Sequence, residues 1–273
     1  MGSRLRRGFG GQAEALGHRD RPIEFLGVSV SPWYVAVISP SRRPLTDRLD
    51  IDVSEHGRTS ALAYRADGGN RAKVTLVLAH GAGAGQDSRF ITQFANGLAS
   101  RGVDVLTFNF LYTEERRRIP DRTEKLEACY RAAISAARSH GPFSGNTVFI
   151  GGKSMGGRIA THLAAAAGSE AAANGISGLV LLGYPLHPPG KPDQLRAAHL
   201  EKIRVPVLFV QGSRDPFGTP AELQPVVERL SADVTLHIVE NGDHSLAPPK
   251  KGPLTVDQIY GDLQDMIVDW LRR

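Results

Sequence analysis

The chain has 273 residues, of which 41% are hydrophobic and 22% charged, a composition typical of a soluble globular protein with room for a full α/β core. No apolar run reaches the roughly 18 residues that cross a bilayer, so we expect no membrane association. The formal net charge is +5, and residues 1–50, with eight Lys and Arg against five Asp and Glu, carry +3 of it. The rest of the chain is near neutrality, which gives no case for nucleic-acid binding.

Residues 1–46 differ from the rest of the chain. They are rich in Gly, Arg, Ser and Pro and show no sustained periodicity, so we predict a poorly ordered N-terminal extension. Residues 47–273 then form a single α/β domain. The only cysteine, Cys129, lies in a helical pattern, where we interpret it as a small packed hydrophobe rather than a reactive thiol. One cysteine allows no internal disulfide, which favours a reducing, cytoplasmic location.

Strands and helices alternate from about residue 48 onward. Two N-terminal strands, Leu49–Val53 and Ser60–Tyr64, are predicted on either side of a turn at His56–Gly57, as an antiparallel pair. Buried strands follow at Val74–Ala79, Val103–Phe110, Thr147–Gly151, Gly178–Gly183, Val205–Gln211 and Val234–Val239. Helical patterns cover 90–98, 122–139, 155–167, 219–230 and 256–272. This alternation predicts a doubly wound, mostly parallel sheet, with the active site at the carboxyl ends of its strands.

A Gly-x-Ser-x-Gly motif, Gly152–Gly156, stands between a predicted buried strand and a predicted helix. Small residues on both sides permit a sharp, strained turn that lifts the Ser154 hydroxyl above the sheet, and the start of the helix adds positive potential there. Because the motif occurs in this strand–turn–helix context, we predict that Ser154 is a nucleophile rather than an incidental serine in a tight turn.

A serine hydroxyl needs a general base and a group that orients the base. Asp215 and His244 each follow a predicted strand, and they come after Ser154 in the order Ser, acid, His. We therefore predict a triad of Ser154, His244 and Asp215. Asp243 is an alternative acid, disfavoured because a side chain adjacent in sequence to the histidine usually points elsewhere.

Acyl transfer also needs two donors for the developing oxyanion. We assign them to the backbone N–H groups of Met155, directly after the nucleophile, and of Ala82, in the glycine-rich loop after the third strand. His80, which opens that loop, is expected to brace it rather than to exchange protons. No histidine, cysteine or carboxylate spacing indicates a metal, and no phosphate or nucleotide motif is present, so we expect no cofactor.

Four segments together resemble a particular family: Leu78–Gly83, Gly151–Arg158, Gly183–Lys191 and Asn241–Ser245. This small α/β-hydrolase-like family includes a testis-expressed protein and a subunit of the NSL histone-acetyltransferase complex, and it is similar to dienelactone hydrolases. The resemblance covers about residues 70–272 and implies the α/β-hydrolase fold, with Ser154, Asp215 and His244 in the triad positions. It implies no substrate, and a serine stands where dienelactone hydrolases use cysteine.

The segment between the strands at Gly178 and Val205 is too short for a large cap domain, so we expect an open site, roofed in part by residues 185–192. Aromatic and imidazole groups around it are candidate substrate-binding walls, with ordinary packing as the alternative: Phe110, Tyr112, Tyr184 and His187. Lys153 and Arg158 flank the turn. We interpret them as solvated or structural charges, although they are also placed to attract an acidic substrate.

These features predict a serine hydrolase, esterase-like, acting on a small-molecule acyl substrate: a carboxylester, a thioester or a small amide. A non-catalytic protein that keeps the fold as a binding or scaffold module is the alternative, and the family resemblance motivates it. Acyl transfer to an acceptor other than water ranks below hydrolysis, because an open site does not exclude water. The natural substrate and the oligomeric state stay open.

Overall fold

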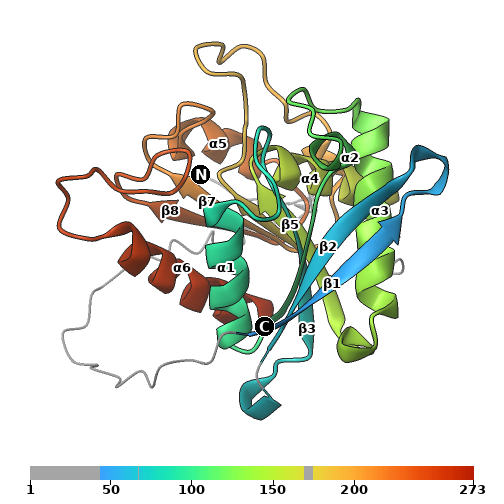
Figure 1. The fold of residues 1–273 in the computed structure, drawn as a ribbon. Helices are drawn as coiled ribbons and strands as arrows, with labels where there is room; N and C mark the ends of the chain where they lie inside the picture. Colours follow the sequence, from blue (N-terminus) through green and yellow to red (C-terminus); the bar gives the residue numbers. More distant parts are fainter. Residues whose placement is uncertain (1–43, 67, 169–174) are drawn as a thin grey trace, which may run out of the picture.

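The computed structural model describes residues 44–66, 68–168 and 175–273. One 8-stranded sheet runs through it in the order β1-β2-β4-β3-β5-β6-β7-β8 (Figure 1). Its strands are β1 (Leu45–Asp52), β2 (Arg58–Arg65), β3 (Val74–Ala79), β4 (Asp104–Phe108), β5 (Thr147–Lys153), β6 (Leu179–Leu182), β7 (Val207–Gly212) and β8 (Val234–Val239). The β1–β2 and β2–β4 pairs are antiparallel and the others parallel, so the carboxyl ends of β3 to β8 meet at one edge.

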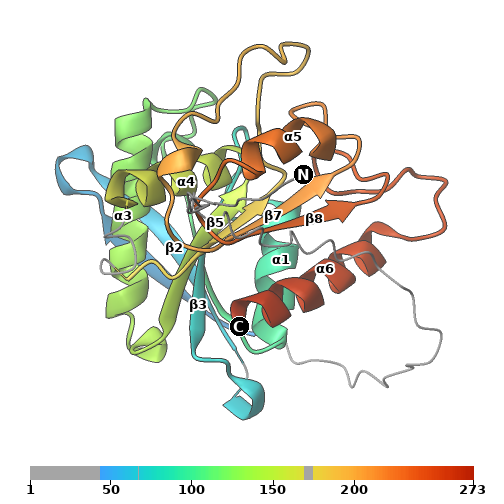
Figure 2. The ribbon, with the colours of Figure 1, turned by 180° about the vertical axis from the view of Figure 1, so that it is seen from behind.

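Helices cover both faces of the sheet (Figures 1 and 2). They are α1 (Arg89–Ser100), α2 (Leu111–Glu114), α3 (Thr123–Ser139), α4 (Met155–Ala167), α5 (Pro220–Val227) and α6 (Val256–Leu271). Helices α1 and α6 pack together on one face, whereas α3 and α4 pack on the other. Capping boxes start α5 at Thr219 and α6 at Thr255, each completed by a Glu or Gln three residues later.

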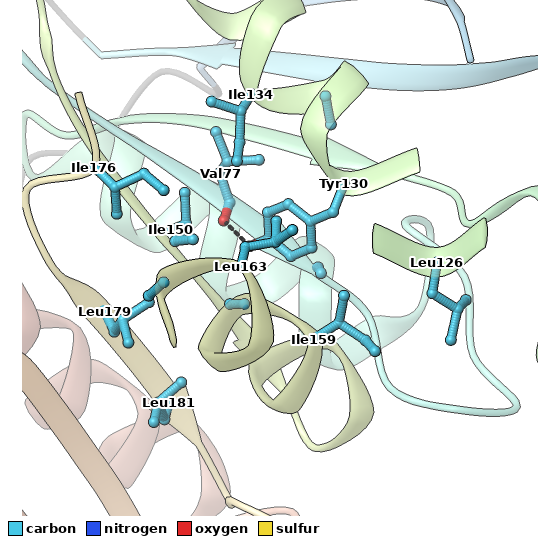
Figure 3. Packing of buried hydrophobic residues seen from close by; sticks show 14 of the residues in the cluster. Val77, Leu126, Tyr130, Ile134, Ile150, Ile159, Leu163, Ile176, Leu179 and Leu181 are labelled. Atoms are coloured by element: carbon cyan, nitrogen blue, oxygen red, sulfur yellow. Dashed lines mark hydrogen bonds between the residues drawn. The ribbon is translucent and has the colours of Figure 1, made fainter. Parts of the chain in front are cut away.

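The core divides between the two faces because successive side chains of a strand point to opposite sides. In β3, Leu76 and Leu78 belong to the apolar cluster under α1 and α6, whereas Val77 belongs to the cluster under α3 and α4. Figure 3 shows the second cluster, to which Ile159 and Leu163 of α4 and Leu179 and Leu181 of β6 belong. Parallel strands covered on both faces explain why these segments read as continuous apolar runs.

The structure confirms the doubly wound sheet, the antiparallel N-terminal strands and the absence of a large cap between β6 and β7. The predicted extension, residues 1–46, lies almost wholly outside the described residues, and β1 begins at Leu45, two residues before the predicted domain boundary. The short helix α2 was not predicted, since four residues carry too little periodicity. In the described part of the chain, no helix has the length and apolar character to span a bilayer.

Tyr130 of α3 ties the two central strands together. Its buried hydroxyl lies within donating distance of the Val77 carbonyl, at 2.8 Å (Figure 3). The same hydroxyl accepts the N–H of Gly151 at 2.8 Å and lies 2.5 Å from the Gly151 carbonyl. Tyr130→Phe is expected to lower the unfolding free energy by about 1–3 kcal/mol, because the buried Gly151 N–H loses its partner. Urea unfolding measures the change.

Tyr260→Phe is the control for this substitution. The Tyr260 hydroxyl donates to the Ser245 carbonyl at 2.6 Å, and Ser245 is exposed, so water can replace the hydroxyl as its partner. We expect a loss below about 1 kcal/mol. Equal losses in the two variants would argue that the Tyr130 hydroxyl is not needed to satisfy the strand backbone.

Candidate active site

Ser154 lies at the sharp turn between β5 and α4. Its backbone has φ 51° and ψ −116°, a left-handed conformation that costs a non-glycine residue about 1–3 kcal/mol. The neighbouring glycines are sterically required: a Cβ on Gly152 would lie 2.5 Å from the Ala79 carbonyl oxygen, and one on Gly156 would lie 2.6 Å from it. The local sequence thus permits a strained turn that holds the Ser154 hydroxyl at the carboxyl edge of the sheet.

The structure brings together the three side chains that the sequence singled out. The Ser154 hydroxyl lies 2.9 Å from Nε2 of His244, and Nδ1 of His244 lies 2.8 and 3.0 Å from the two Asp215 oxygens. Ser154 follows β5, Asp215 follows β7 and His244 follows β8, so three neighbouring parts of one sheet edge supply them. With Nδ1 protonated toward Asp215, Nε2 is free to accept the serine proton.

Asp215 is fully buried and its carboxylate is held on both oxygens. One oxygen accepts the Phe217 N–H at 2.8 Å, and the other accepts the Gln211 side-chain amide at 3.0 Å. Asp243, the alternative acid, instead accepts the N–H groups of Ser245 and Ala247 at 2.7 and 3.0 Å, so it shapes the loop. Adjacent side chains point apart here, as expected, and only Asp215 contacts the imidazole.

Two residues near the triad were missed from sequence. Gln211, fully buried at the end of β7, also donates to the carbonyls of Gly218 at 2.7 Å and Tyr184 at 3.3 Å. A polar residue closing an apolar strand four positions before Asp215 is a usable signal for such a role. The Phe217 ring stacks on the His244 imidazole with centroids 4.2 Å apart, and no sequence pattern indicated that contact.

The loop after β3 faces the turn at Ser154. The N–H groups of Ala82 and Met155 were predicted as oxyanion donors, and both residues line the same cavity as Ser154. His80 braces this loop: its Nδ1 donates to the Gly81 carbonyl at 2.8 Å, and its Nε2 accepts the Phe110 N–H at 3.1 Å. Burial lowers the pKa of His80 to about 4, so the ring stays neutral and does not exchange protons near pH 7.

A cavity of about 570 Å³ opens over Ser154 and His244, a volume within the usual range for small-molecule sites. Pro185 lines it, in agreement with the predicted roof. The four predicted walls do not: Phe110, Tyr112, Tyr184 and His187 are all 4% exposed or less and lie behind the cavity surface. Tyr184, for example, donates to the Arg196 carbonyl at 2.8 Å and supports the wall from inside.

Lys153 is buried, so of the two expected possibilities, a solvated or a structural charge, it is not the solvated one. The residue is 8% exposed and lines the cavity, and in the described part of the chain its ammonium has no hydrogen-bond partner. The ammonium lies 5.8 Å from the centre of the Phe90 ring. Burial lowers the pKa of Lys153 from its usual value of 10.5 to about 8, although the charges of Asp215 and Asp243 act in the opposite direction.

Lys153→Met is therefore expected to stabilise the protein at pH 7. The folded pKa lies below the unfolded one, so the unfolded chain binds more protons between pH 8 and 10.5, and stability rises with pH across this window. Below pH 8 the folded protein bears the full free-energy cost of burying the charged ammonium, which corresponds to about 3 kcal/mol. Urea unfolding at pH 7, 8, 9 and 10 should show the advantage of the variant shrinking as the pH rises; a constant advantage would contradict the prediction.

Residues 72–272 match the family model described as an alpha/beta hydrolase domain. The chain belongs to this family. In this α/β-hydrolase, the match includes the turn at Ser154, the segments that carry Asp215 and His244, and the loop at Ala82. It leaves out β1 and β2, the antiparallel strands at the edge of the sheet.

Solved structures share the fold of this α/β-hydrolase at low sequence identity. A dienelactone hydrolase from Anabaena variabilis is 19% identical, with a TM-score of 0.64 over 84% of this chain and 97% of its own. A serine hydrolase without a lid from Xanthomonas campestris is 20% identical, with a TM-score of 0.63 over 86% and 99%. The esterase domain of a Rhodothermus marinus protein is 15% identical, with a TM-score of 0.59 over 84% and 98%. At these identities the likeness shows the fold alone.

Proposed function

We propose that the protein is a serine hydrolase of small acyl substrates, with carboxylic esters as the favoured class and thioesters and small amides as alternatives. The observation that carries the proposal is the continuous hydrogen-bonded chain from the Ser154 hydroxyl through His244 to the buried Asp215, at the floor of an open cavity. The names of structural relatives, a dienelactone hydrolase and an esterase domain, add support for ester chemistry.

The proposed reaction begins when the Ser154 oxygen attacks the substrate carbonyl while Nε2 of His244 takes the hydroxyl proton. The oxygen of the tetrahedral intermediate accepts hydrogen bonds from the N–H groups of Ala82 and Met155. Met155 begins α4, so its N–H has no partner inside the helix. His244 then protonates the leaving group, the carbonyl re-forms as an acyl-serine, and water releases the acid by the same steps in reverse order.

Asp215 holds the imidazole in the tautomer that this reaction needs and stabilises its cation. Water reaches the open cavity, so hydrolysis is favoured over transfer to another acceptor. The narrower resemblance to the family of the testis-expressed protein and the NSL-complex subunit stays a prediction, and so does a cytoplasmic location. Cys129 is fully buried and burial raises its thiol pKa to about 12, which makes it inert.

A fluorophosphonate probe tests the proposal directly, because it reacts only with an activated serine. Wild type should be labelled, and labelling should be lost in Ser154→Ala and retained in Ser245→Ala, which removes a second hydroxyl of the same cavity. A panel of 4-nitrophenyl esters of rising acyl length should then show turnover. Labelling that survives Ser154→Ala would contradict the assignment, and no labelling with no turnover would favour a binding or scaffold protein.

A further inference from the structure

Two arginine side chains line the cavity beside Ser154. Arg158 lies one helical turn after Ser154 on α4, and its N–H donates to the Ser154 carbonyl at 3.0 Å. Arg196 comes from the segment between β6 and β7 and lines the same cavity. In the ranges that the structure describes, neither guanidinium has a hydrogen-bond or ion-pair partner, and Nε of Arg158 is buried. The sequence suggested no role for Arg196.

The backbone of Arg196 is held firmly in place. Its N–H donates to the Leu186 carbonyl at 2.7 Å, and its own carbonyl accepts the Tyr184 hydroxyl at 2.8 Å. Tyr184 is 1% exposed, so the support comes from inside the protein. Arg196 therefore lines the cavity from a backbone position that is fixed by hydrogen bonds. Arg158 also lines the cavity from a fixed position, because it lies in the first turns of α4.

The two guanidinium groups are close enough to influence each other. Burial lowers the pKa of Arg158, Tyr184 acts in the opposite direction, and the charge of Arg196 lowers it further. A partly buried cation is unfavourable unless an anion pairs with it, and the charge of Arg196, which acts on Arg158, has the same sign. An anion placed between the two groups would relieve both the repulsion and the loss of hydration.

Carboxylates of the protein near this wall are already engaged. Asp121 lines the cavity, but its Oδ1 lies 2.6 Å from Arg117 and 3.7 Å from Lys125, and its Oδ2 accepts the Tyr112 N–H at 3.0 Å. Glu127, on the adjoining face of α3, lies 3.4 Å from Arg131 and from His162. Lys153 adds a third cation to the cavity lining. The cavity lining thus carries more positive charge than the nearby carboxylates neutralise, which favours binding of an anion from solution.

We propose that Arg158 and Arg196 form an anion-binding subsite that selects acyl substrates carrying a carboxylate. Guanidinium groups bind carboxylates through paired, charge-assisted hydrogen bonds, which fix orientation as well as adding affinity. Side chains one helical turn apart have Cβ atoms about 6 Å apart, so a carboxylate held by Arg158 lies within one small substrate of the Ser154 hydroxyl. The preference for charged acyl substrates rests on the proposed hydrolase function, whereas binding of an anion by the two arginines does not depend on it.

Ester pairs that differ only in charge test the selectivity. Monoethyl succinate, glutarate and adipate are compared with ethyl butanoate, pentanoate and hexanoate, in which a methyl replaces the carboxylate on the acyl side. Acetoxyacetate and ethyl acetate make the same comparison on the leaving-group side. In wild type we expect a kcat/KM at least about tenfold higher for the charged member in one of the two arms. A ratio of one or less in both arms overturns the proposal.

Variants tie the preference to the two arginines. The ratio of kcat/KM for the charged and neutral esters should fall at least about fivefold in Arg158→Gln and in Arg196→Gln, and approach one in the double variant. A general loss of structure lowers both rates and leaves the ratio unchanged. Arg229→Gln removes the same charge from an exposed position, where Arg229 pairs with Glu201 at 3.2 Å, and should keep the wild-type ratio. An unchanged ratio in the double variant overturns the assignment.

A binding measurement separates this proposal from the hydrolase function. Glutarate should raise the Tm of Ser154→Ala in a concentration-dependent way and should not raise that of Ser154→Ala carrying both arginine substitutions. That result supports the subsite even if no ester is hydrolysed. If esters are hydrolysed without a charge preference, and glutarate shifts neither Tm, the hydrolase function stands and the subsite is refuted.

Discussion

Ser154→Ala and His244→Ala are each expected to lower kcat for ester hydrolysis by about 10⁴- to 10⁶-fold, and the double variant should be no slower than the slower single variant. The serine oxygen and the imidazole lie 2.9 Å apart, and in the proposed reaction they act as one unit, since the hydroxyl is a weak nucleophile without the base. Once either is removed, the other has no reaction to assist.

Purified single and double variants, assayed with the best nitrophenyl ester, measure this non-additivity. Ser245→Ala is the matched control, because Ser245 lines the same cavity but lies outside the hydrogen-bonded chain, and it should retain activity within about fivefold. Losses that multiply in the double variant would show that Ser154 and His244 act independently. Residual activity above a tenth in either single variant would remove that residue from the proposed mechanism.

The elements most accurately predicted are those whose sequence carries a strong, local pattern. The predicted bounds of β3, α4 and β8 agree with the structure, because each is a continuous apolar or amphipathic segment ended by a loop. The three residues of the predicted triad could be chosen together because the carboxyl ends of parallel strands meet at one edge, so residues far apart in sequence converge there. Asp243 could be set aside by a similarly local argument about adjacent side chains.

What the sequence did not predict depends on packing across the fold. Tyr184 and His187 follow β6 and were expected at the cavity surface, yet their side chains turn inward, and the cavity wall is formed instead by Pro185 and Arg196. Lys153 was expected to be a solvated or a structural charge, and the sequence did not decide between them, since the direction of its side chain depends on how the Ser154 turn meets β6 and the loop after β8. The periodicity of a single segment does not predict these side-chain directions, because they depend on contacts between segments.

The buried cation and the strained serine both cost stability at the same place. Ser154 is held at φ 51°, and beside it the ammonium of Lys153 has no hydrogen-bond partner among the residues that the structure describes. Each is unfavourable in isolation, and unfavourable features of this kind concentrate where a protein binds or reacts. These two features agree with the proposals that the cavity binds an anion and stabilises a negatively charged reacting oxygen.

Asp215→Asn is expected to lower kcat by about 10⁴-fold while leaving the fold intact. The Asn oxygen can still accept the Phe217 N–H, but the Asn amide then faces the Gln211 amide and Nδ1 of His244, which are both donors in wild type. Gln211 is fixed by its bonds to Gly218 and Tyr184, so the imidazole is the group that changes. It moves its proton to Nε2 and can no longer accept one from Ser154.

Asp243→Asn provides the comparison, because Asp243 is the adjacent carboxylate and contacts only loop N–H groups through its side chain. We expect it to retain kcat within about tenfold, since an Asn oxygen can accept the same two bonds. Near-ultraviolet circular dichroism should show unchanged packing in both variants. A severe loss in Asp243→Asn with little change in Asp215→Asn would transfer the acid role to Asp243. A loss of packing in Asp215→Asn would instead make its carboxylate a structural requirement of the β7 turn.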